Sequence, residues 1–296
     1  QASTKSSPAA WGENDCVIKA GADAERTGVA TLKVDGCRLW SPEDPFLYEV
    51  EVRGEGDAIK AKFGMRSFTF DAETGYALLN GKIYFMRGSN ICLFRFFEDP
   101  LRGSKPWDEA WIRKMYTQFK DLHWNSFRFS ICQPPTRWYE LADELGFLVQ
   151  DEYPIWKMFP DGSEFTTDGL VLEYTEWLQD RWNNPCVVIW DANNETPAKC
   201  TSEATHKVRK LDFSDRPWDN GWQTPERPGD TYEAHEYHFK DSLFRLAYLG
   251  RVPKSPKGNK ERNPVVLNEY GWLWLNRDGS PTTLTRELYG AMSPGI

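Results

Sequence analysis

Short motifs that mark nucleotide or zinc sites are missing from this sequence. It contains no GxGxxG and no GxxxxGK(S/T) segment, which disfavours the binding of nucleotide phosphates on a glycine-rich loop. The six cysteines are scattered and form no CxxC pair, which argues against a zinc knuckle. The HEYH segment places His235 and His238 three positions apart, so it is not the HExxH zinc motif. We therefore expect no metal and no cofactor.

Long apolar runs are also missing. No run approaches the ~18–20 residues that a membrane helix needs, and no signal peptide is visible. The 36 Lys and Arg residues are outnumbered by 44 Asp and Glu residues, and the resulting charge of −8 repels nucleic-acid phosphates and anionic lipids. We therefore expect neither nucleic acid nor a membrane as a partner.

Several properties stay open at this level. The disulfide state of the six cysteines, the compartment and the formation of a homo-oligomer are undecided, although a periplasmic or extracellular location is favoured over the cytoplasm. The first residue is Gln1 rather than Met, which indicates that something upstream was removed or never included.

Aromatic side chains, by contrast, are abundant, with 14 Trp, 12 Tyr and 17 Phe. Most of them belong in a core, which 40% apolar residues can supply. Flat rings with a polar edge also suit a cleft that binds sugars. A chain of 296 residues allows one large domain or two modest ones.

The chain changes its pattern near residue 77. Before that point, alternating apolar and polar residues predict antiparallel strands at 29–36, 46–54 and 59–70. Because about 100 residues make a complete two-sheet sandwich, we assign residues 1–76 to part of a β-sandwich.

Residues 77–296 alternate predicted strands with predicted helices, which indicates right-handed βα units and a parallel sheet. Strands are predicted at 82–90, 125–130, 147–156, 186–195, 230–239 and 264–272, and helices at 107–123, 134–146, 170–182, 199–211 and 282–292. Six of these strands end in polar or charged residues, as expected at the mouth of a barrel. We therefore predict an α/β fold with a (β/α)8 TIM-type barrel, incomplete at its C-terminus.

Two glutamates stand out at these strand ends. Glu195 follows VVIWDANN and Glu269 follows VVLN, so each comes after an apolar strand and directly after an asparagine. Retaining glycosidases use two carboxyl groups about 5–5.5 Å apart, one protonated and one ionised. Two carboxyl groups that close push their pKa values apart. The pair predicts hydrolysis of a glycosidic bond.

The sequence resembles glycoside hydrolase family 2, the family of β-galactosidases, β-glucuronidases and β-mannosidases. The similar segments occur in the family's order across roughly residues 38–275: LWSPEDPFLYEVEV, FGMRSF, LNGKIYFMRGSN, NSFRFS, RWYELADELGFLVQDE, NNPCVVIWDANNE and NPVVLNEYGW. This resemblance implies that the sandwich of residues 1–76 is immunoglobulin-like and partial and that a barrel follows it. It also implies a retaining, exo-acting β-glycosidase whose partner is a β-linked oligosaccharide or glycoside.

The resemblance also implies roles for individual residues. Glu195 matches the general acid/base and Glu269 the nucleophile. Asn194 matches the residue that bonds the sugar's 2-hydroxyl, and Arg128 matches the arginine that supports the nucleophile region. His235 and Tyr237 match the strand whose tyrosine touches the nucleophile.

Further candidates come from their positions alone. Asn90 ends the first barrel strand and is expected to meet a sugar hydroxyl or to cap the loop. Trp272 follows Glu269 by three residues and is expected to be a sugar platform or a core residue. Asp151 and Glu152 are expected either to support the site or to form an ion pair at the barrel rim.

The sequence departs from the family pattern in two ways. Ile131, Cys132 and Gln133 replace a His-Tyr-Pro run, the 91–100 loop lacks the usual histidine, and no Asn-x-Lys signature of glucuronidases is found, so the sugar stays undetermined. The chain is also short for the family. It is therefore interpreted as a fragment, as a chain completed by another, or as an abbreviated relative. Two alternative functions remain: an endo-acting barrel glycosidase and a non-catalytic carbohydrate-binding remnant.

Overall fold

The computed structural model describes residues 18–20, 26–28, 34–54, 56–160, 164–235, 263–270, 275–276 and 278–292. The chain divides into two compact units, residues 1–38 and 39–296. In the first unit, β1 (Ile18–Ala20) pairs antiparallel with β2 (Arg26–Gly28). Of the strand predicted at 29–36, the structure describes residues 34–36. These residues are not in a strand, because residues 35–36 form a turn in which Gly36 has a φ of 62°.

Antiparallel strands open the second unit, as predicted. β3 (Tyr48–Gly54) and β4 (Asp57–Phe63) form a hairpin, and β5 (Phe68–Phe70), β6 (Ala77–Leu79) and β7 (Lys82–Ile83) form a three-stranded sheet. The predicted run 59–70 is thus two strands. The strand is interrupted at Gly64. This glycine packs so closely on Pro185 that a Cβ atom at position 64 would lie 2.7 Å from the proline ring.

Parallel strands follow along the rest of the unit. Five of them pair in chain order: β8 (Gly88–Ile91), β9 (Ser126–Phe129), β10 (Leu148–Glu152), β11 (Val187–Asp191) and β12 (Trp218–Asp219). β13 (Tyr232–His235) and β14 (Val265–Glu269) form a second parallel pair. The Thr231 N–H group donates to the Trp218 carbonyl at 2.9 Å, and the Tyr270 hydroxyl donates to the Gly88 carbonyl at 3.1 Å. These bonds connect the two sheets into one barrel wall.

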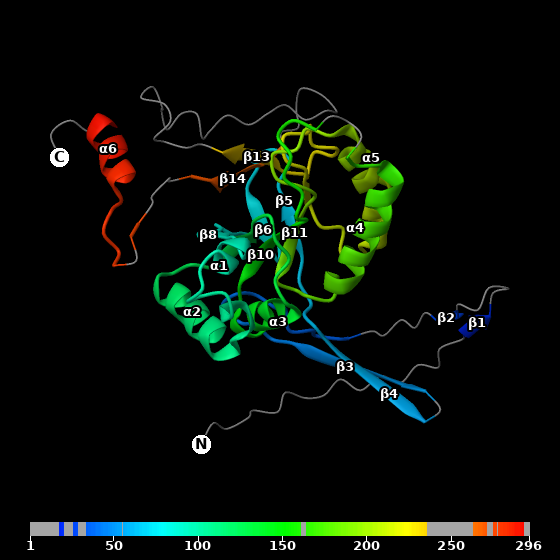
Figure 1. The fold of residues 1–296 in the computed structure, drawn as a ribbon. Helices are drawn as coiled ribbons and strands as arrows, with labels where there is room; N and C mark the ends of the chain where they lie inside the picture. Colours follow the sequence, from blue (N-terminus) through cyan, green and yellow to red (C-terminus); the bar gives the residue numbers. More distant parts are fainter. Residues whose placement is uncertain are drawn as a thin grey trace, which may run out of the picture. The chain divides into compact units, whose positions relative to one another are not determined.

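The longer helices cover the outside of these strands (Figure 1). They are α2 (Glu109–Asp121), α3 (Thr136–Leu145), α4 (Thr167–Arg181) and α5 (Lys199–Val208); α6 (Thr283–Met292) follows β14. Some of these helix ends carry ordinary caps, whereas Pro135 and Ala198 leave the starts of α3 and α5 without a side-chain cap. Asp108 accepts a hydrogen bond from the Trp111 N–H at 3.0 Å, and Gly146 ends α3 with a φ of 75°.

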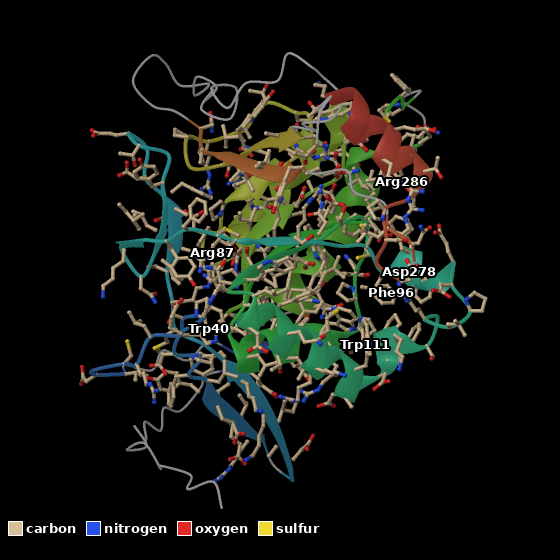
Figure 2. All side chains as sticks on the ribbon, turned by 90° about the vertical axis from the view of Figure 1, so that its left-hand side faces the viewer. Trp40, Arg87, Phe96, Trp111, Asp278 and Arg286 are labelled. Carbon is tan, nitrogen blue, oxygen red and sulfur yellow. The ribbon has the colours of Figure 1, made fainter. Side chains whose placement is uncertain are left out.

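Several short elements were not predicted from the sequence, namely β1, β2, β6, β12, α1 and two turns of 3₁₀ helix. The short helix α1 (Phe94–Phe97) and the strand β12 contain four and two residues, which is too few to show a period. Two single turns of 3₁₀ helix, η1 (Lys105–Trp107) and η2 (Arg209–Leu211), complete the described elements. Phe96 of α1 packs edge-on against Trp111 of α2, with 5.5 Å between ring centroids (Figure 2).

The core lies between the parallel strands and the helices. β9, β10 and β11 are buried on both faces, and β11 (VVIWD) accordingly reads as a near-continuous apolar run. The buried polar residues of β9 and β10 include Arg128 and Glu152, which meet inside the barrel. Many of the abundant tryptophans are found here, and the ring of Trp177 lies 5.0 Å from that of Trp190 and 5.9 Å from that of Trp218. Cys37, Cys92, Cys132, Cys186 and Cys200 are free thiols. No helix in the described part of the chain is long and apolar enough to cross a membrane.

Candidate active site

A single buried arginine occupies the centre of the barrel. Arg128 of β9 donates from Nε to Asp191 at 3.1 Å and from Nη1 to Glu269 at 3.1 Å. Its Nη2 atom donates to Glu152 and lies 3.7 Å from an oxygen of Glu233. The guanidinium is 4% exposed and therefore interacts with these four carboxylates almost without screening by water. The carboxylates come from β10, β11, β13 and β14, so Arg128 connects both parts of the barrel wall.

Glu195 lies just beyond β11 and has an unusual backbone. Its φ is 45°, in the left-handed region that non-glycine residues rarely adopt. Trp156 Nε1 donates to Oε2 at 3.1 Å, and His235 Nδ1 contacts Oε1 at 2.8 Å. Both carboxylate oxygens are thus held in place from other segments of the barrel mouth. Such strain, stabilised by fixed partners, is characteristic of functional positions.

The structure brings Glu195 close to Glu269, although 73 residues separate them in the sequence. A carboxylate oxygen of each and a ring nitrogen of His235 all lie within 4.8 Å of one another. His235 Nδ1 is 3.6 Å from Glu269 Oε2. The side chains of Glu195 and Glu269 are 13% and 15% exposed, so both reach the surface of the site. This spacing is close to the about 5–5.5 Å of retaining glycosidases and well below the about 6.5–9.5 Å of inverting ones.

His235 lies between two carboxylates and is itself nearly buried. Its Nε2 atom is 2.5 Å from Glu233 Oε1, on the side opposite the contact with Glu195. Burial opposes the charge on the imidazole, but the bonds to Glu195 and Glu233 outweigh it and raise the pKa of His235 to about 10. The hydrogen bond from His235 in turn lowers the pKa of Glu195. The proton of this pair therefore resides mainly on the imidazole.

The remaining acidic groups of the interior are fully buried. Burial, reinforced by neighbouring carboxylates, raises the pKa of Glu152 and of Asp219 well above their ordinary values. Burial also raises the pKa of Asp191 to about 6. Among the described residues, the cations in contact with Glu152, Asp191 or Glu233 are Arg128 and His235. Part of this cluster therefore keeps its protons near neutral pH.

Among the residues that the structure describes, two groups of side chains are compact enough to be considered as metal sites. One consists of Glu195, His235 and Glu269, and the other of Asp191, Asp219 and Glu233. In the first group His235 Nδ1 and Glu195 Oε1 are already paired with each other in a hydrogen bond of 2.8 Å. The second group lies beside the guanidinium of Arg128, whose charge disfavours a second cation. We assign a metal to neither group.

The other predicted residues fall into three classes. Asn194 is buried, and its Oδ1 atom accepts a hydrogen bond from Arg128 Nη2 at 2.8 Å. Asn90 of β8 is half-buried and in register with Arg128 on the neighbouring strand. Tyr237 and Trp272 lie outside the described residues.

Asp151 and Glu152 are both fully buried, so neither forms an ion pair at the rim. Consecutive strand residues face opposite sides, and here they have different partners. Asp151 accepts hydrogen bonds from Tyr139 at 2.6 Å and from Trp177 at 2.8 Å, which attaches β10 to α3 and α4. Glu152 faces inward and binds Arg128.

Four residues of the site were missed by sequence reasoning: Asp191, Asp219, Glu233 and Trp156. Glu233 had a usable signal, because it lies two positions before His235 and strand residues two apart share a face. Asp219 had none, since its two-residue strand shows no period. Asp191 ends an apolar strand, and the sequence pattern does not distinguish it from the other residues that lead to Glu195.

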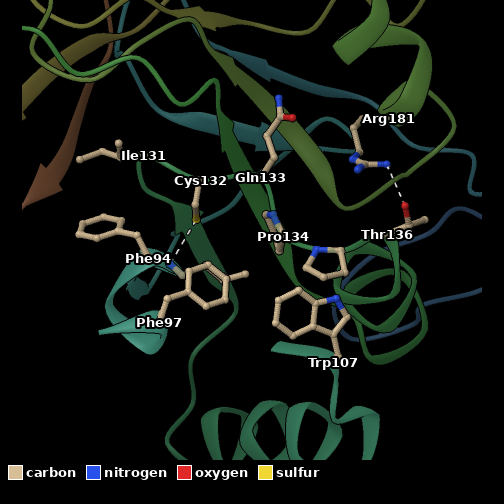
Figure 3. Close-up of a pocket in the computed structure, with 11 residues that line it drawn as sticks. Phe94, Phe97, Trp107, Ile131, Cys132, Gln133, Pro134, Thr136 and Arg181 are labelled. Carbon is tan, nitrogen blue, oxygen red and sulfur yellow. Dashed lines mark hydrogen bonds between the residues drawn. The ribbon is translucent and has the colours of Figure 1, made fainter. Parts of the chain in front are cut away.

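A cavity of about 530 Å³ lies in the loops that follow β8 and β9 (Figure 3). Its lining includes Phe94, Phe97, Trp107, Ile131, Cys132 and Gln133. The rings of Phe97 and Trp107 are 5.7 Å apart and more than half exposed. The N–H group of Ile131 donates to Glu152, so the wall of the cavity is connected to the carboxylates around Arg128.

Two family models match the sequence. "Glycosyl hydrolases family 2, TIM barrel domain" matches residues 71–289, and "Glycosyl hydrolases family 2" matches residues 3–66. The first of these covers well over half of the chain. The chain belongs to glycoside hydrolase family 2. This confirms the family that the sequence motifs predicted.

Curated relatives of this family 2 chain include two β-galactosidases. That of Pectobacterium atrosepticum is 30% identical over 267 residues, which are 84% of this chain and 25% of that protein. That of Erwinia tasmaniensis is 28% identical over 265 residues, which are 84% of this chain and 25% of that protein. The chain therefore spans about a quarter of the length of these relatives.

Solved structures of two β-glucuronidases share the fold of this family 2 chain. That from Dictyoglomus thermophilum gives a TM-score of 0.61 at 17% identity and covers 88% of this chain and 50% of its own. The structure from Parabacteroides merdae, with glycerol in its active site, gives a TM-score of 0.58 at 22% identity. It covers 72% of this chain and 28% of its own. The predicted TIM-type barrel preceded by part of an immunoglobulin-like sandwich is confirmed, while the boundary at residue 76 stays a prediction.

Replacing Arg128 tests the central position of its guanidinium. We expect Arg128→Gln to lower the free energy of unfolding by about 3–5 kcal/mol at pH 7, because it leaves buried carboxylates without their cation. The loss should be smaller at pH 5, where carboxyl groups with a raised pKa, such as Asp191, take up protons instead. Urea unfolding at both pH values measures this.

Arg137→Gln is the matched control. Arg137 also pairs with three carboxylates, those of Glu109, Glu140 and Glu144, but on the surface of α2 and α3. Exposed pairs contribute little, so we expect a loss below about 1 kcal/mol. Equal losses in the two variants would contradict a special role for Arg128.

Proposed function

We propose that this chain carries the catalytic centre of a retaining β-glycosidase that acts by double displacement, with Glu269 as nucleophile and Glu195 as general acid/base. The observation that carries the proposal is the approach of their carboxylate oxygens to within 4.8 Å at the carboxyl ends of two parallel strands. The family membership and the names of its relatives support this class of reaction.

In the first step, Glu269 attacks the anomeric carbon while Glu195 protonates the leaving oxygen, and a glycosyl-enzyme forms. Arg128 supports this step, because its Nη1 atom donates to Glu269 Oε1 and stabilises the negative charge of the nucleophile. In the second step, Glu195 takes a proton from water, which attacks the same carbon and releases the sugar.

Asn194 is proposed to orient the sugar. Its carbonyl oxygen accepts from Arg128, which leaves its amide nitrogen to donate to the sugar's 2-hydroxyl. That bond strengthens as the ring flattens toward an oxocarbenium ion. Asn90, one strand away and in register with Arg128, is proposed to contact another hydroxyl.

The substrate is proposed to be a β-linked oligosaccharide, cleaved from one end. The relatives' names include both galactosidases and glucuronidases, so the sugar at the cleaved bond is not assigned. The cavity in the loops after β8 and β9 has the aromatic walls that sugar rings prefer, and we propose that it holds the leaving part of the substrate. The same cavity favours an endo-acting glycosidase as the second candidate, which product analysis on a polysaccharide distinguishes. A non-catalytic carbohydrate-binding remnant is less consistent with the convergence of both glutamates.

Azide rescue separates the two glutamates by stereochemistry. We expect Glu195→Ala to lower kcat on a glycoside with a poor leaving group by about a hundredfold to ten-thousandfold. Azide should restore turnover of an activated aryl glycoside and yield a β-glycosyl azide, because it replaces water on the glycosyl-enzyme. Glu269→Ala should yield the α-glycosyl azide, because azide then attacks the substrate directly. Proton NMR of the products measures both.

Glu140→Ala, a surface carboxylate of α3, is the control and should behave as wild type. The proposal is wrong if the two active-site variants give azides of the same configuration, or if neither responds to azide.

Trp107 tests the leaving-group cavity. We expect Trp107→Ala to raise KM for an oligosaccharide about tenfold, the effect of losing ~1.4 kcal/mol of contact, with kcat little changed. KM for a glycosyl fluoride, whose leaving group is a single atom, should stay the same. Steady-state kinetics on both substrates gives the result. Phe213→Ala removes a ring that is 99% exposed and outside the cavity, and should change neither value. Equal effects on both substrates would contradict this assignment.

A further inference from the structure

His235 makes a close contact at each of its ring nitrogens. Nδ1 lies 2.8 Å from Glu195 Oε1 and Nε2 lies 2.5 Å from Glu233 Oε1. The imidazole side chain is 7% exposed and that of Glu233 is fully buried, so water does not separate these groups. Glu195, His235 and Glu233 thus form a continuous row from the mouth of the barrel to its interior.

The row formed by Glu195, His235 and Glu233 holds more than one shared proton. Nδ1 and Glu195 Oε1 form a hydrogen bond, whereas Nε2 and Glu233 Oε1 are in ion-pair contact without the alignment of a hydrogen bond. At either contact an unprotonated nitrogen would bring its lone pair against that of a carboxylate oxygen, so each contact favours a protonated nitrogen. A neutral imidazole carries one N–H group and can satisfy only one of the two contacts. The three groups must therefore share two protons, either as an imidazolium between two carboxylates or with one carboxyl group protonated.

We propose that Glu233 and His235 are positioning residues that store the proton used by Glu195. This inference rests on the proposed function of Glu195 as acid/base. When the glycosidic carbon–oxygen bond breaks, its electron pair stays on the leaving oxygen. The Nδ1 proton moves to Glu195 Oε1 and on to that oxygen, which leaves a neutral His235 whose remaining proton faces Glu233. When water attacks the glycosyl-enzyme, its proton passes to Glu195 and back to Nδ1, and the row returns to its first state.

The charges around His235 favour this storage. Glu195 approaches from beyond β11, Glu233 from its own strand β13, and Glu269 from β14 at 3.6 Å. Behind Glu233 lie Asp191 and Asp219, each with an oxygen within 4.8 Å of it. The opposing charge is Arg128 of β9, which lies 3.7 Å from the other oxygen of Glu233. Anionic groups therefore dominate around the imidazole and keep it protonated.

The pH dependence follows from the sign of this effect. The pKa of His235 is raised to about 10, so the stored proton is present at neutral pH and is lost only as the pH rises toward that value. Without the charge of Glu233, the loss should occur at lower pH. A purely structural role for Glu233 would alter stability but would not move this titration.

The direct test is NMR of the ¹⁵N-labelled chain, which has only four histidines to assign. We expect both ring nitrogens of His235 to stay protonated at pH 8 in the wild type. In Glu233→Gln the midpoint should fall by about 1–3 pH units, the effect of removing a neighbouring opposite charge. Glu226→Gln makes the same chemical change at the exposed pair of His206 and Glu226, and should leave the titration of His235 unchanged.

A neutral His235 at pH 7 in the wild type would overturn the proposal, as would an unchanged midpoint in Glu233→Gln. If circular dichroism shows that Glu233→Gln does not fold, Glu195→Gln provides the second variant. It removes the other carboxylate and should lower the midpoint in the same direction, and an unchanged midpoint there overturns the proposal too.

Activity supplies an independent readout. In Glu233→Gln the alkaline limb of the kcat/KM profile should move to lower pH, while a fluorinated glycoside should still label Glu269. An unmoved alkaline limb with intact labelling would refute the proton store alone. Loss of labelling in the wild type would refute the assignment of Glu269, whereas the NMR titration of His235 would still decide whether the proton is held there.

Discussion

The structure depends on one buried guanidinium and the carboxylates around it. Arg128 replaces water as the partner of Glu152, Asp191, Glu233 and Glu269, which come from four different strands. Leaving such charges without a partner in the interior is costly, so the strands can approach one another only with Arg128 between them. The fold and the site are thus specified by the same contacts, and Glu269 is held by the barrel rather than by a loop.

Around this centre the acidic groups differ in protonation because their surroundings differ. Glu152 and Asp219 are fully buried and favour the protonated form, whereas Glu195 accepts hydrogen bonds from Trp156 and His235 and favours the ionised one. A retaining mechanism needs an acid that can give a proton and regain it. In the proposed mechanism the proton is supplied by His235, a neighbour of Glu195, rather than by a high pKa of Glu195 itself.

The sequence was informative where a residue follows a long periodic element. Glu195, Glu269 and Arg128 come at the ends of clear apolar strands, and the order of strands and helices was sufficient to predict the barrel that brings them together. Their convergence on one another required the parallel register, which places the ends of β9, β11 and β14 at one mouth.

The rest of the site depends on contacts that no local pattern encodes. Asp219 lies on a strand of two residues, and Trp156 comes from a loop that is held beside Glu195 by bonds to Asn194 and Thr196. The interruption between β4 and β5 at Gly64 also depends on a distant contact, because Gly64 packs against Pro185, 121 positions further along the chain.

The most direct measurement is mass spectrometry of the chain after reaction with a 2-deoxy-2-fluoro-β-glycosyl fluoride, in which the fluorine slows release of the sugar from the enzyme. Trypsin cleavage after Arg262 and Arg277 gives a peptide, residues 263–277, whose only carboxylic side chain is Glu269. The account predicts that the sugar is found on this peptide. Label on a peptide that lacks Glu269, at a stoichiometry near one per chain, would contradict it.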